Sequence, residues 1–330
     1  MKRSYWLLTV LLAVFTACGT ANPGATTTAG VGATTTAVED TTNAAPVTTS
    51  GEASAFPVTI EADNGSVTIE AEPDSIVSLS ATATEMLFAI GAGEQVVAVD
   101  DQSTYPADAP LTDLSGFAPN VEAILGYSPD LVIIAHDPGD LIASLEAQNV
   151  PVISYGSAFT LDDTYRQIEG LGLATGHAEE AVIANELIGT DLDEIVADAP
   201  EIPEGTDYYH EVDNTYFTAT SSTFLGQIYS MFGLENIADP ADADGAAFGF
   251  PQLASEFIVD ADPDLIFLGN ALYGESVETV SARPGWETMT AVEEGVIFEL
   301  DSDVVSRWGP RVVDFAQSVS DALTTYVEGG

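Results

Sequence analysis

Short runs of consecutive apolar residues alternate along this chain with segments whose apolar residues recur at helical intervals. Such runs are typical of strands that are buried on both faces of a parallel sheet. Their alternation with helical segments is that of a doubly wound α/β fold. The predicted strands are 76–79, 96–99, 131–135 and 152–154 in the first half of the folded sequence, and 207–212, 265–268 and 296–300 in the second.

A β-hairpin is expected before the first of these strands, because 58–60 and 67–69 flank the turn Asp63-Asn64-Gly65, which favours positive φ. The segment 177–199 contains no proline and would form a helix about 34 Å long. A helix of that length can join two lobes. The other expected helices are 80–90, 120–126, 141–148 and 311–326.

One pattern occurs in both halves of the folded sequence. Its two copies read EAILGYSPDLVII from Glu122 and EFIVDADPDLIFL from Glu256. In each copy a helix leads through Pro-Asp-Leu into a buried strand, and the acid in the first turn is favoured by the positive end of the helix dipole. We therefore predict two related, doubly wound α/β lobes joined by a single long helix, with a ligand site in the cleft between them.

The first residues of the chain have the features of a secretion signal. Lys2 and Arg3 precede an apolar segment over 5–15, which is too short to span a bilayer stably. Small residues then precede Cys18, the only cysteine in the chain. This arrangement resembles a bacterial lipobox, which implies cleavage before Cys18 and diacylglycerol on its sulfur; simple secretion is the alternative.

We predict that the chain has five parts. We predict a lipoprotein signal peptide over 1–17, and a lipidated cysteine with a disordered Thr/Ala-rich tether over 18–55, where too little apolar surface is available for folding. An N-terminal lobe over 56–160, a linking segment with the bridging helix over 161–200 and a C-terminal lobe over 201–330 follow.

The chain is strongly acidic. Its 53 Asp and Glu residues and 6 Lys and Arg residues give a formal net charge of −47, which argues against nucleic acid or an anionic membrane surface as a partner. Acids spread through globular sequence are typical of proteins from salty or alkaline habitats; capture of cations by the whole surface is the functional alternative. Asp239, Asp242 and Asp244 do not follow the order of a calcium loop, and we interpret them as a solvated acidic loop.

Several separated motifs resemble the extracytoplasmic substrate-binding proteins that serve importers of cobalamin, ferric siderophores and haem. In order, they read PDSIVSLSATATEMLFAIGAGEQVVAVDDQSTYPADAP, GFAPNVEAILGYSPDLVI, SARPGW and SRWGPR. The resemblance extends from about Val58 to the C-terminus and implies two lobes that move little when a ligand binds. It also implies that Glu122 and Glu256, one on each lobe, dock into arginine pockets of an ABC permease; the alternative is that they only satisfy the helix dipoles.

The same resemblance suggests ligand-binding residues. Cobalamin-binding relatives line the cleft with aromatic side chains, which suit a large flat macrocycle, and the matching positions here are Tyr105, Phe117, Phe217 and Phe250. Those relatives have a tryptophan at the position of His136. This histidine is either an axial ligand to cobalt or haem iron, or a hydrogen-bonded loop residue.

Basic residues bear on the choice of ligand. Siderophore-binding relatives offer arginines to an anionic ferric complex, whereas only Arg166, Arg283, Arg307 and Arg311 remain here after the signal. Arg307 lies with Trp308 in a loop that can reach the cleft, and Arg311 is expected to start the last helix and pair with an acid. We therefore favour a corrinoid such as cobalamin over a ferric siderophore; a haem-binding protein of the same importer class is a further alternative.

Other classes of function find less support. The sequence has no G-x-S-x-G, H-E-x-x-H or phosphate-loop motif, so we expect neither an enzyme nor a resident cofactor. A bare metal ion needs several converging ligands, and the only histidines are His136, His177 and His210. A surface sensor or scavenger without a transporter is a further alternative. The expected protein is a monomeric, extracytoplasmic lipoprotein, anchored to the cell membrane, that delivers its ligand to an ABC import permease.

Overall fold

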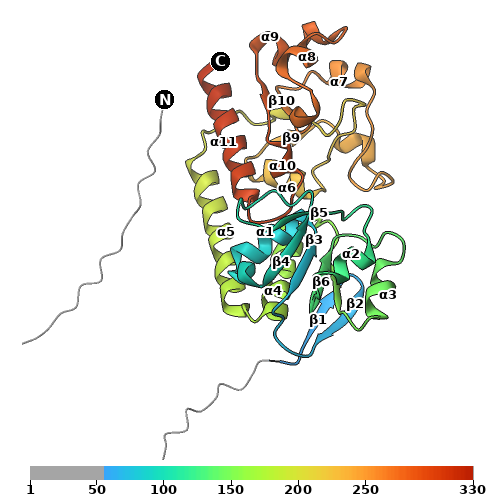
Figure 1. Ribbon diagram of the computed structural model, residues 1–330. Helices are drawn as coiled ribbons and strands as arrows, with labels where there is room; N and C mark the ends of the chain where they lie inside the picture. The colour runs from blue at the N-terminus through green and yellow to red at the C-terminus, as the bar shows by residue number, and fades with distance from the viewer. Residues whose placement is uncertain (1–55, 330) are drawn as a thin grey trace, which may run out of the picture. The chain divides into compact units, whose positions relative to one another are not determined.

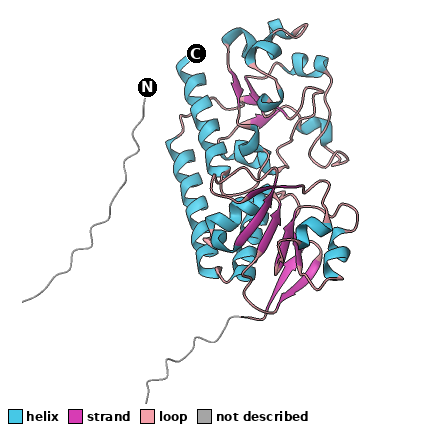
Figure 2. Ribbon diagram, viewed as in Figure 1, coloured by secondary structure: helices cyan, strands magenta, loops and turns pink. Residues whose placement is uncertain are grey.

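The computed structural model of the protein describes residues 56–329. These residues form two α/β lobes, each with a parallel sheet at its centre and helices on both sides (Figure 1 and Figure 2). The fold class predicted from the sequence is therefore confirmed. The predicted signal peptide, the tether and Cys18 lie outside the described residues.

The N-terminal sheet contains β3 (Ile76–Leu79), β4 (Val96–Asp100), β5 (Leu111–Leu114), β6 (Leu131–Ile134) and β7 (Val152–Ser154). Its order is β5-β4-β3-β6-β7, with all strands parallel. Because β4 and β5 lie on one side of β3 while β6 and β7 lie on the other, the direction of winding reverses between β3 and β6. Every residue of β3, β6 and β7 is buried, as expected for a sheet that is covered on both faces.

Helices cover both faces of this sheet. One face packs against α1 (Ala81–Ala89) and α4 (Leu161–Thr175), and the other against α2 (Val121–Leu125) and α3 (Leu141–Glu146). The predicted hairpin is present as β1 (Val58–Ala62) and β2 (Gly65–Ile69). Its turn residue Asn64 binds the backbone of β7 twice, at 2.9 and 3.0 Å, which attaches the hairpin to the edge of the lobe.

The C-terminal sheet contains β8 (Asp207–Glu211), β9 (Glu235–Asn236), β10 (Leu265–Leu268) and β11 (Ile297–Glu299) in the parallel order β11-β10-β8-β9. Here the winding reverses between β8 and β10. The helices of this part of the chain are α6 (Phe224–Met231), α7 (Ser255–Ala261), α8 (Val277–Ser281), α9 (Thr290–Glu294), α10 (Ser302–Val305) and α11 (Val312–Gly329). Short 3₁₀ helices are η1 (Ala92–Gln95), η2 (Asp239–Asp242), η3 (Ala271–Tyr273) and η4 (Trp286–Thr288).

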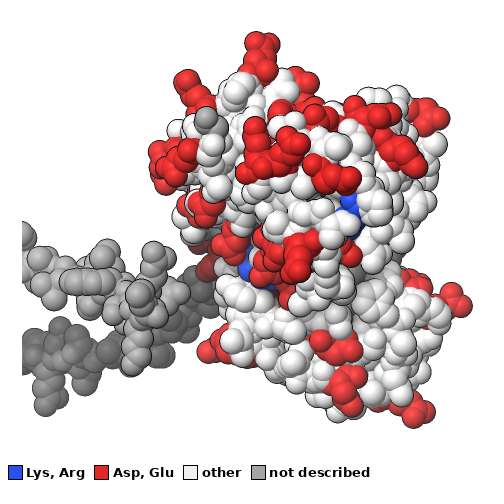
Figure 3. All heavy atoms as spheres, turned by 90° about the horizontal axis from the view of Figure 1, so that it is seen from above, with Lys and Arg blue, Asp and Glu red and all other residues white. Residues whose placement is uncertain are grey.

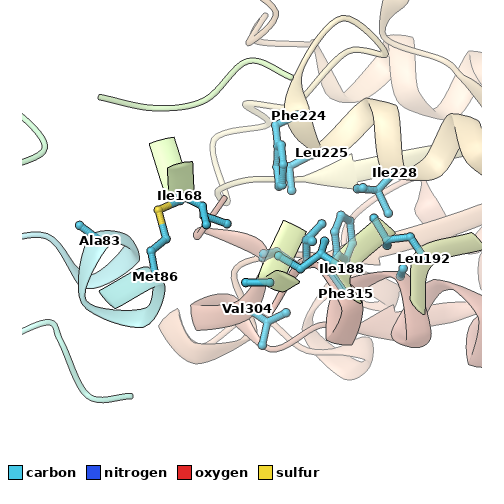
Figure 4. Packing of buried hydrophobic residues seen from close by; sticks show 14 of the residues in the cluster. Ala83, Met86, Ile168, Ile188, Leu192, Phe224, Leu225, Ile228, Val304 and Phe315 are labelled. Carbon is cyan, nitrogen blue, oxygen red and sulfur yellow. The ribbon is translucent and has the colours of Figure 1, made fainter. Parts of the chain in front are cut away.

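The long bridging helix is α5 (Ala178–Asp198), which lies within a residue of its predicted limits at each end. It runs beside α4 of the first lobe and α11 of the second (Figure 1). Gly172 of α4 permits a close approach, since a Cβ atom there would lie 2.4 Å from that of Ala181. Ile188 and Leu192 of α5 belong to a hydrophobic cluster that includes residues of both lobes (Figure 4). The lobes therefore share a packed core along the bridging helix.

The repeated sequence pattern occupies equivalent places in the two lobes. Glu122 is the second residue of α2, which leads into β6, and Glu256 is the second residue of α7, which leads into β10. Both strands lie directly beside the first strand of their sheet, across the point where the winding reverses. The prediction of two similarly built α/β units is thus confirmed.

All seven predicted strands are present, but some elements were not predicted. β5 is an edge strand with exposed positions, and β9 has only two residues, so neither forms a buried apolar run. α4 carries Gly170 and Gly172, and glycine lowers helix propensity. A capping box between Thr160 and Asp163 starts this helix nevertheless.

Candidate ligand-binding cleft

Two adjoining pockets lie between the lobes. We call them the apolar pocket, of about 320 Å³, and the polar pocket, of about 460 Å³. Four residues line both, so the two pockets form one continuous cleft. These shared residues are Ser157, Tyr273, Ser306 and Trp308.

The cleft lies at the carboxyl ends of strands in both sheets. Ser80 and Ala135 follow β3 and β6, and Val212 and Gly269 follow β8 and β10. These are the two strand pairs between which the winding reverses, so the loops after them diverge and leave a crevice. Open α/β sheets bind ligands at such points.

The wall of the apolar pocket is formed mainly by the C-terminal lobe. Thr223 caps α6 by accepting a hydrogen bond from the Gly226 amide at 3.1 Å, and α6 then directs two apolar residues to the pocket. Residues from the ends of other elements complete the wall. The apolar lining residues are Ala158, Phe159, Val212, Phe224, Leu225, Phe250, Tyr273, Val305 and Trp308.

Phe250 is held in the wall by an acid of the preceding loop. The Asp242 carboxylate accepts hydrogen bonds from the backbone amides of Ala247 at 2.7 Å and Gly249 at 2.6 Å. Asp239 similarly accepts from the amide and hydroxyl of Ser221, at 2.8 and 2.6 Å. The interpretation of this segment as a merely solvated acidic loop was therefore wrong for these two acids, because they brace the loops beside the pocket.

His210 lines the apolar pocket from the end of β8 and is almost fully buried. Its Nδ1 lies 2.8 Å from the hydroxyl of Tyr229. The neighbouring Tyr208 and Tyr209 face opposite sides of the sheet, as strand alternation predicts, and both are core residues.

A low-pH loss of stability is expected from His210. Burial lowers its pKa to about 4, whereas an unfolded histidine titrates near about 6.5. Because the folded pKa is the lower one, this group favours folding fully above about pH 6.5, and that contribution is lost as the pH falls towards about 4. The loss amounts to about 3 kcal/mol.

Urea unfolding of the unmodified protein and of His210→Gln at pH 7 and pH 4 measures this effect. Glutamine cannot titrate and retains a polar group opposite Tyr229, so the variant should lose about 3 kcal/mol less over this interval. Parallel losses in both proteins would contradict the assignment.

The polar pocket lies nearer the N-terminal sheet. His136 follows β6 and lies exposed beside Phe117, with ring centroids 5.2 Å apart. Asp100, at the end of β4, is buried and accepts a hydrogen bond from the Ser103 hydroxyl at 2.6 Å. Burial raises the pKa of this carboxyl, partly offset by its hydrogen bonds. Arg307 enters the same pocket from the C-terminal lobe.

Five of the seven predicted ligand-binding residues line the cleft: Phe117, His136, Phe250, Arg307 and Trp308. The other two lie elsewhere. The ring of Tyr105 lies 4.5 Å from the Arg311 guanidinium and lines a different pocket with Phe88 and Pro310. Phe217 forms a bridge with Gln252 on a loop beside the C-terminal sheet.

Arg311 was expected to start the last helix and to pair with an acid, and the structure agrees. It directly precedes α11 and binds both oxygens of Glu85, at 2.6 and 3.0 Å.

Several lining residues were not predicted. Phe159 follows β7, and Tyr273 ends the 3₁₀ helix η3. The available signal for Phe159 was an aromatic residue in the loop after a predicted buried strand. No comparable signal marked Tyr273, although its side chain is 81% exposed.

Glu122 and Glu256 lie on the surface and line neither pocket. Both are exposed, and neither carboxylate has a hydrogen bond or ion pair within residues 56–329. The backbone of α2 is capped instead by Asn120, whose side chain accepts from the Ala123 amide at 3.1 Å. Both glutamates are thus available to a partner.

Two further properties concern the described part of the chain only. Between residues 56 and 329, no helix combines the length and apolarity needed to cross a bilayer. No group of three or more His, Cys, Asp or Glu side chains there is arranged to hold a metal ion.

Comparison with known proteins gives the family. A model of the family described as periplasmic binding protein matches residues 76–304. The chain is 31% identical over 283 residues to a protein of Bacillus subtilis named as an uncharacterized ABC transporter substrate-binding lipoprotein, YvrC, covering 82% of this chain and 87% of the relative. It is 29% identical over 286 residues to a cobalamin-binding protein of Halobacterium salinarum, covering 82% and 75% respectively.

A solved structure agrees with this result. The periplasmic heme-binding protein RhuT of Roseiflexus superposes with a TM-score of 0.66 at 25% identity, covering 78% of this chain and 99% of that one. The resemblance noted in the sequence motifs is confirmed. The chain belongs to the periplasmic binding protein family, whose members are solute-binding components of transport systems and not enzymes.

Proposed function

We propose that this protein captures a corrinoid of the cobalamin type in the cleft between its lobes and delivers it to an ABC import permease. The observation that carries the proposal is the aromatic wall of the cleft. Phe159, Phe224, Phe250 and Trp308 surround the apolar pocket, and Phe117 lies at the adjoining polar pocket. Large aromatic faces bury much apolar area and suit a flat macrocycle.

The relatives support the same ligand class. The Halobacterium relative is named as cobalamin-binding, and the Bacillus relative as a substrate-binding lipoprotein of an ABC transporter. We further propose an extracytoplasmic monomer anchored to the membrane by lipid on Cys18, with Glu122 and Glu256 as the contacts to the permease.

Haem is the second candidate ligand. His136 lies exposed in the polar pocket beside Phe117, and an imidazole there is a potential axial ligand to iron. The solved heme-binding relative supports this alternative.

Calorimetric titration distinguishes these ligands. A soluble form that begins after Cys18 is titrated with cobalamin, haemin and a ferric hydroxamate. Saturable binding of cobalamin alone supports the corrinoid proposal. Binding of haemin that is lost in His136→Ala would replace it with the haem alternative, and binding of the hydroxamate alone would indicate a siderophore importer.

Truncation of Phe250 is expected to weaken cobalamin binding by about tenfold to a hundredfold, because a buried aromatic contact is worth about 1.5–3 kcal/mol. The matched control is Phe248→Ala, two residues away on the same loop, where the side chain is 79% exposed and does not line the apolar pocket. Calorimetry should show unchanged affinity in the control. Equal affinities in both variants would remove the aromatic-wall model.

Tyr105 and Phe217 remain candidates for contact with peripheral parts of a large ligand. Because neither lines the two cleft pockets, we expect a smaller effect from alanine at either position than from Phe250→Ala.

A further inference from the structure

Arg307 is the arginine that lines the cleft, and its guanidinium is already engaged by protein groups. Its side chain donates hydrogen bonds to the Gln102 carbonyl at 3.0 Å and the Asp303 carboxylate at 3.1 Å, and it lies 3.5 Å from a Glu85 oxygen. The residue is only 7% exposed. A ligand therefore meets an arginine whose charge is compensated on several sides.

The same glutamate binds a second arginine. Glu85 of α1 is buried and accepts from Nε and Nη2 of Arg311. Glu85, Asp303, Arg307 and Arg311 thus form one group of two acids and two arginines, which we call the interlobe ion cluster. Its formal charge is zero, and it joins α1 of the first lobe to the loop before α11 of the second.

Besides Arg307 and its partner Asp303, the lining contains one acid, Asp100, and two histidines, His136 and His210. Asp100 lines the polar pocket without an arginine partner, held instead by the Ser103 hydroxyl and by backbone amides. His210 in the apolar pocket is buried against Tyr229 and is neutral at pH 7. Within the described residues, no arginine or lysine of the lining therefore supplies an uncompensated positive charge.

The remaining arginines do not supply one either. Within the described residues, Arg283 is paired with Glu211 and Glu275, and Arg166 with Asp163. On the face that Figure 3 shows, acidic side chains are scattered over the surface, and the few basic atoms that are visible have acidic atoms beside them. An anionic ligand would have to displace a carboxylate from a buried arginine or lose its hydration beside acids, and both steps are costly.

We propose that the cleft selects ligands that are uncharged or cationic where they meet the polar pocket, and that Arg307 ties the two lobes together instead of receiving an anion. The inference rests on the proposed use of this cleft for ligand binding. It goes further than the proposed function by specifying the charge class of the ligand and the role of Arg307.

Matched ligand pairs test the charge class. One pair is cyanocobalamin and its monocarboxylate, in which one propionamide has been hydrolysed; the other is an uncharged ferric trihydroxamate and a trianionic ferric tricatecholate. We expect the less anionic member of any pair that binds to bind at least about tenfold more tightly. The preference should persist in 1 M salt, where the Debye length is about 3 Å and the field of the surface acids is screened. Equal or tighter binding of the more anionic member would overturn the proposal.

Asp303→Asn tests the role of Arg307. Asp303 is 41% exposed at its side chain and is one partner of this arginine, so its neutralisation should leave the fold intact and leave Arg307 less compensated. We expect affinity for the more anionic ligands to rise about tenfold while affinity for the uncharged ligands stays constant. Glu186→Gln, at an exposed acid on α5, removes the same charge outside the cleft and should change neither. If Asp303→Asn binds the more anionic ligands no more tightly than the unmodified protein does, the proposal is overturned.

Arg307→Gln supplies the opposite test. If Arg307 were an anion receptor, the variant would lose affinity for the anionic ligands alone. If Arg307 instead joins the two lobes, the variant should have a lower melting temperature, and the less anionic ligand of each pair should still bind more tightly. A failed charge inference is distinguishable from a failed proposed function. Binding of the trihydroxamate without binding of either corrinoid would refute the proposed corrinoid ligand but support the preference for less anionic ligands. Tighter binding of the monocarboxylate than of cyanocobalamin would support the corrinoid ligand but refute that preference. Failure of all four ligands to bind would overturn both.

Discussion

Charge reversal of both Glu122 and Glu256 is expected to abolish uptake of the ligand while leaving its affinity unchanged. The two glutamates hold the second position of equivalent helices, are exposed, and have no partner within residues 56–329. If each glutamate faces arginines of a permease, its replacement by arginine turns attraction into repulsion. Like charges that face each other across an interface cost several kcal/mol. The helix dipole alone would account for only about 0.3–1 kcal/mol per residue, so the variant should still fold.

The measurement is uptake of labelled ligand by cells in which the natural copy is replaced by Glu122→Arg/Glu256→Arg, together with titration of the purified variant. Glu278→Arg is the matched control, because Glu278 is an exposed acid at the second position of α8 but does not belong to the repeat. Normal uptake by the double variant would exclude the docking role and favour a sensor or scavenger. Loss of uptake in the control would show that the effect is not specific to the repeated acids.

Replacement of Glu211 by alanine is expected to destabilise the protein by about 3–5 kcal/mol, because it leaves the partly buried Arg283 without its main partner. Glu211 ends β8 and is fully buried. Both of its oxygens accept from Arg283, at 2.5 and 2.7 Å, and one also accepts from the Asn270 amide at 3.0 Å. The guanidinium lies 4.6 Å from the centre of the Trp286 ring, so moving it into water would also break this cation–π contact.

Urea unfolding of Glu211→Ala and of Glu211→Met/Arg283→Met measures this cost. The double variant removes both charges and keeps most of the volume, so it should be markedly more stable than the single variant. Glu275→Gln removes the second, more exposed partner of Arg283 and should cost less than Glu211→Ala. A double variant as unstable as the single one would show that the pairing is not the source of the stability.

Local sequence was sufficient for most elements of the fold. A strand such as Leu265–Leu268 is buried on both faces, so every side chain must be apolar and the run stands out without knowledge of its neighbours. Likewise Gly91 has φ of 84°, and a glycine after a segment with helical periodicity marks the end of that helix. α4 was not predicted, because its glycines serve close packing, of Gly170 against Tyr155 and of Gly172 against Ala181 of α5, and only the assembled fold creates that requirement.

The candidate site was predictable to a smaller extent. Aromatic residues that follow strand ends, such as Phe117, could be proposed from motifs and do line the cleft. The partners of the charged residues could not be predicted, since Arg307 and Glu85 are 3.5 Å apart but separated by 222 positions in the sequence. Nor does the sequence indicate that Asp242 binds backbone amides and thereby holds Phe250.

The sequence by itself determined the two-lobed architecture, the long bridging helix and the family, because these depend on burial patterns and motifs that each segment carries alone. Only the tertiary structure decided which side chains share the cleft and which charges remain available in it. Both depend on distances between residues far apart in the chain. The field that a charged side chain exerts on a ligand depends on how closely opposite charges of the protein approach that side chain.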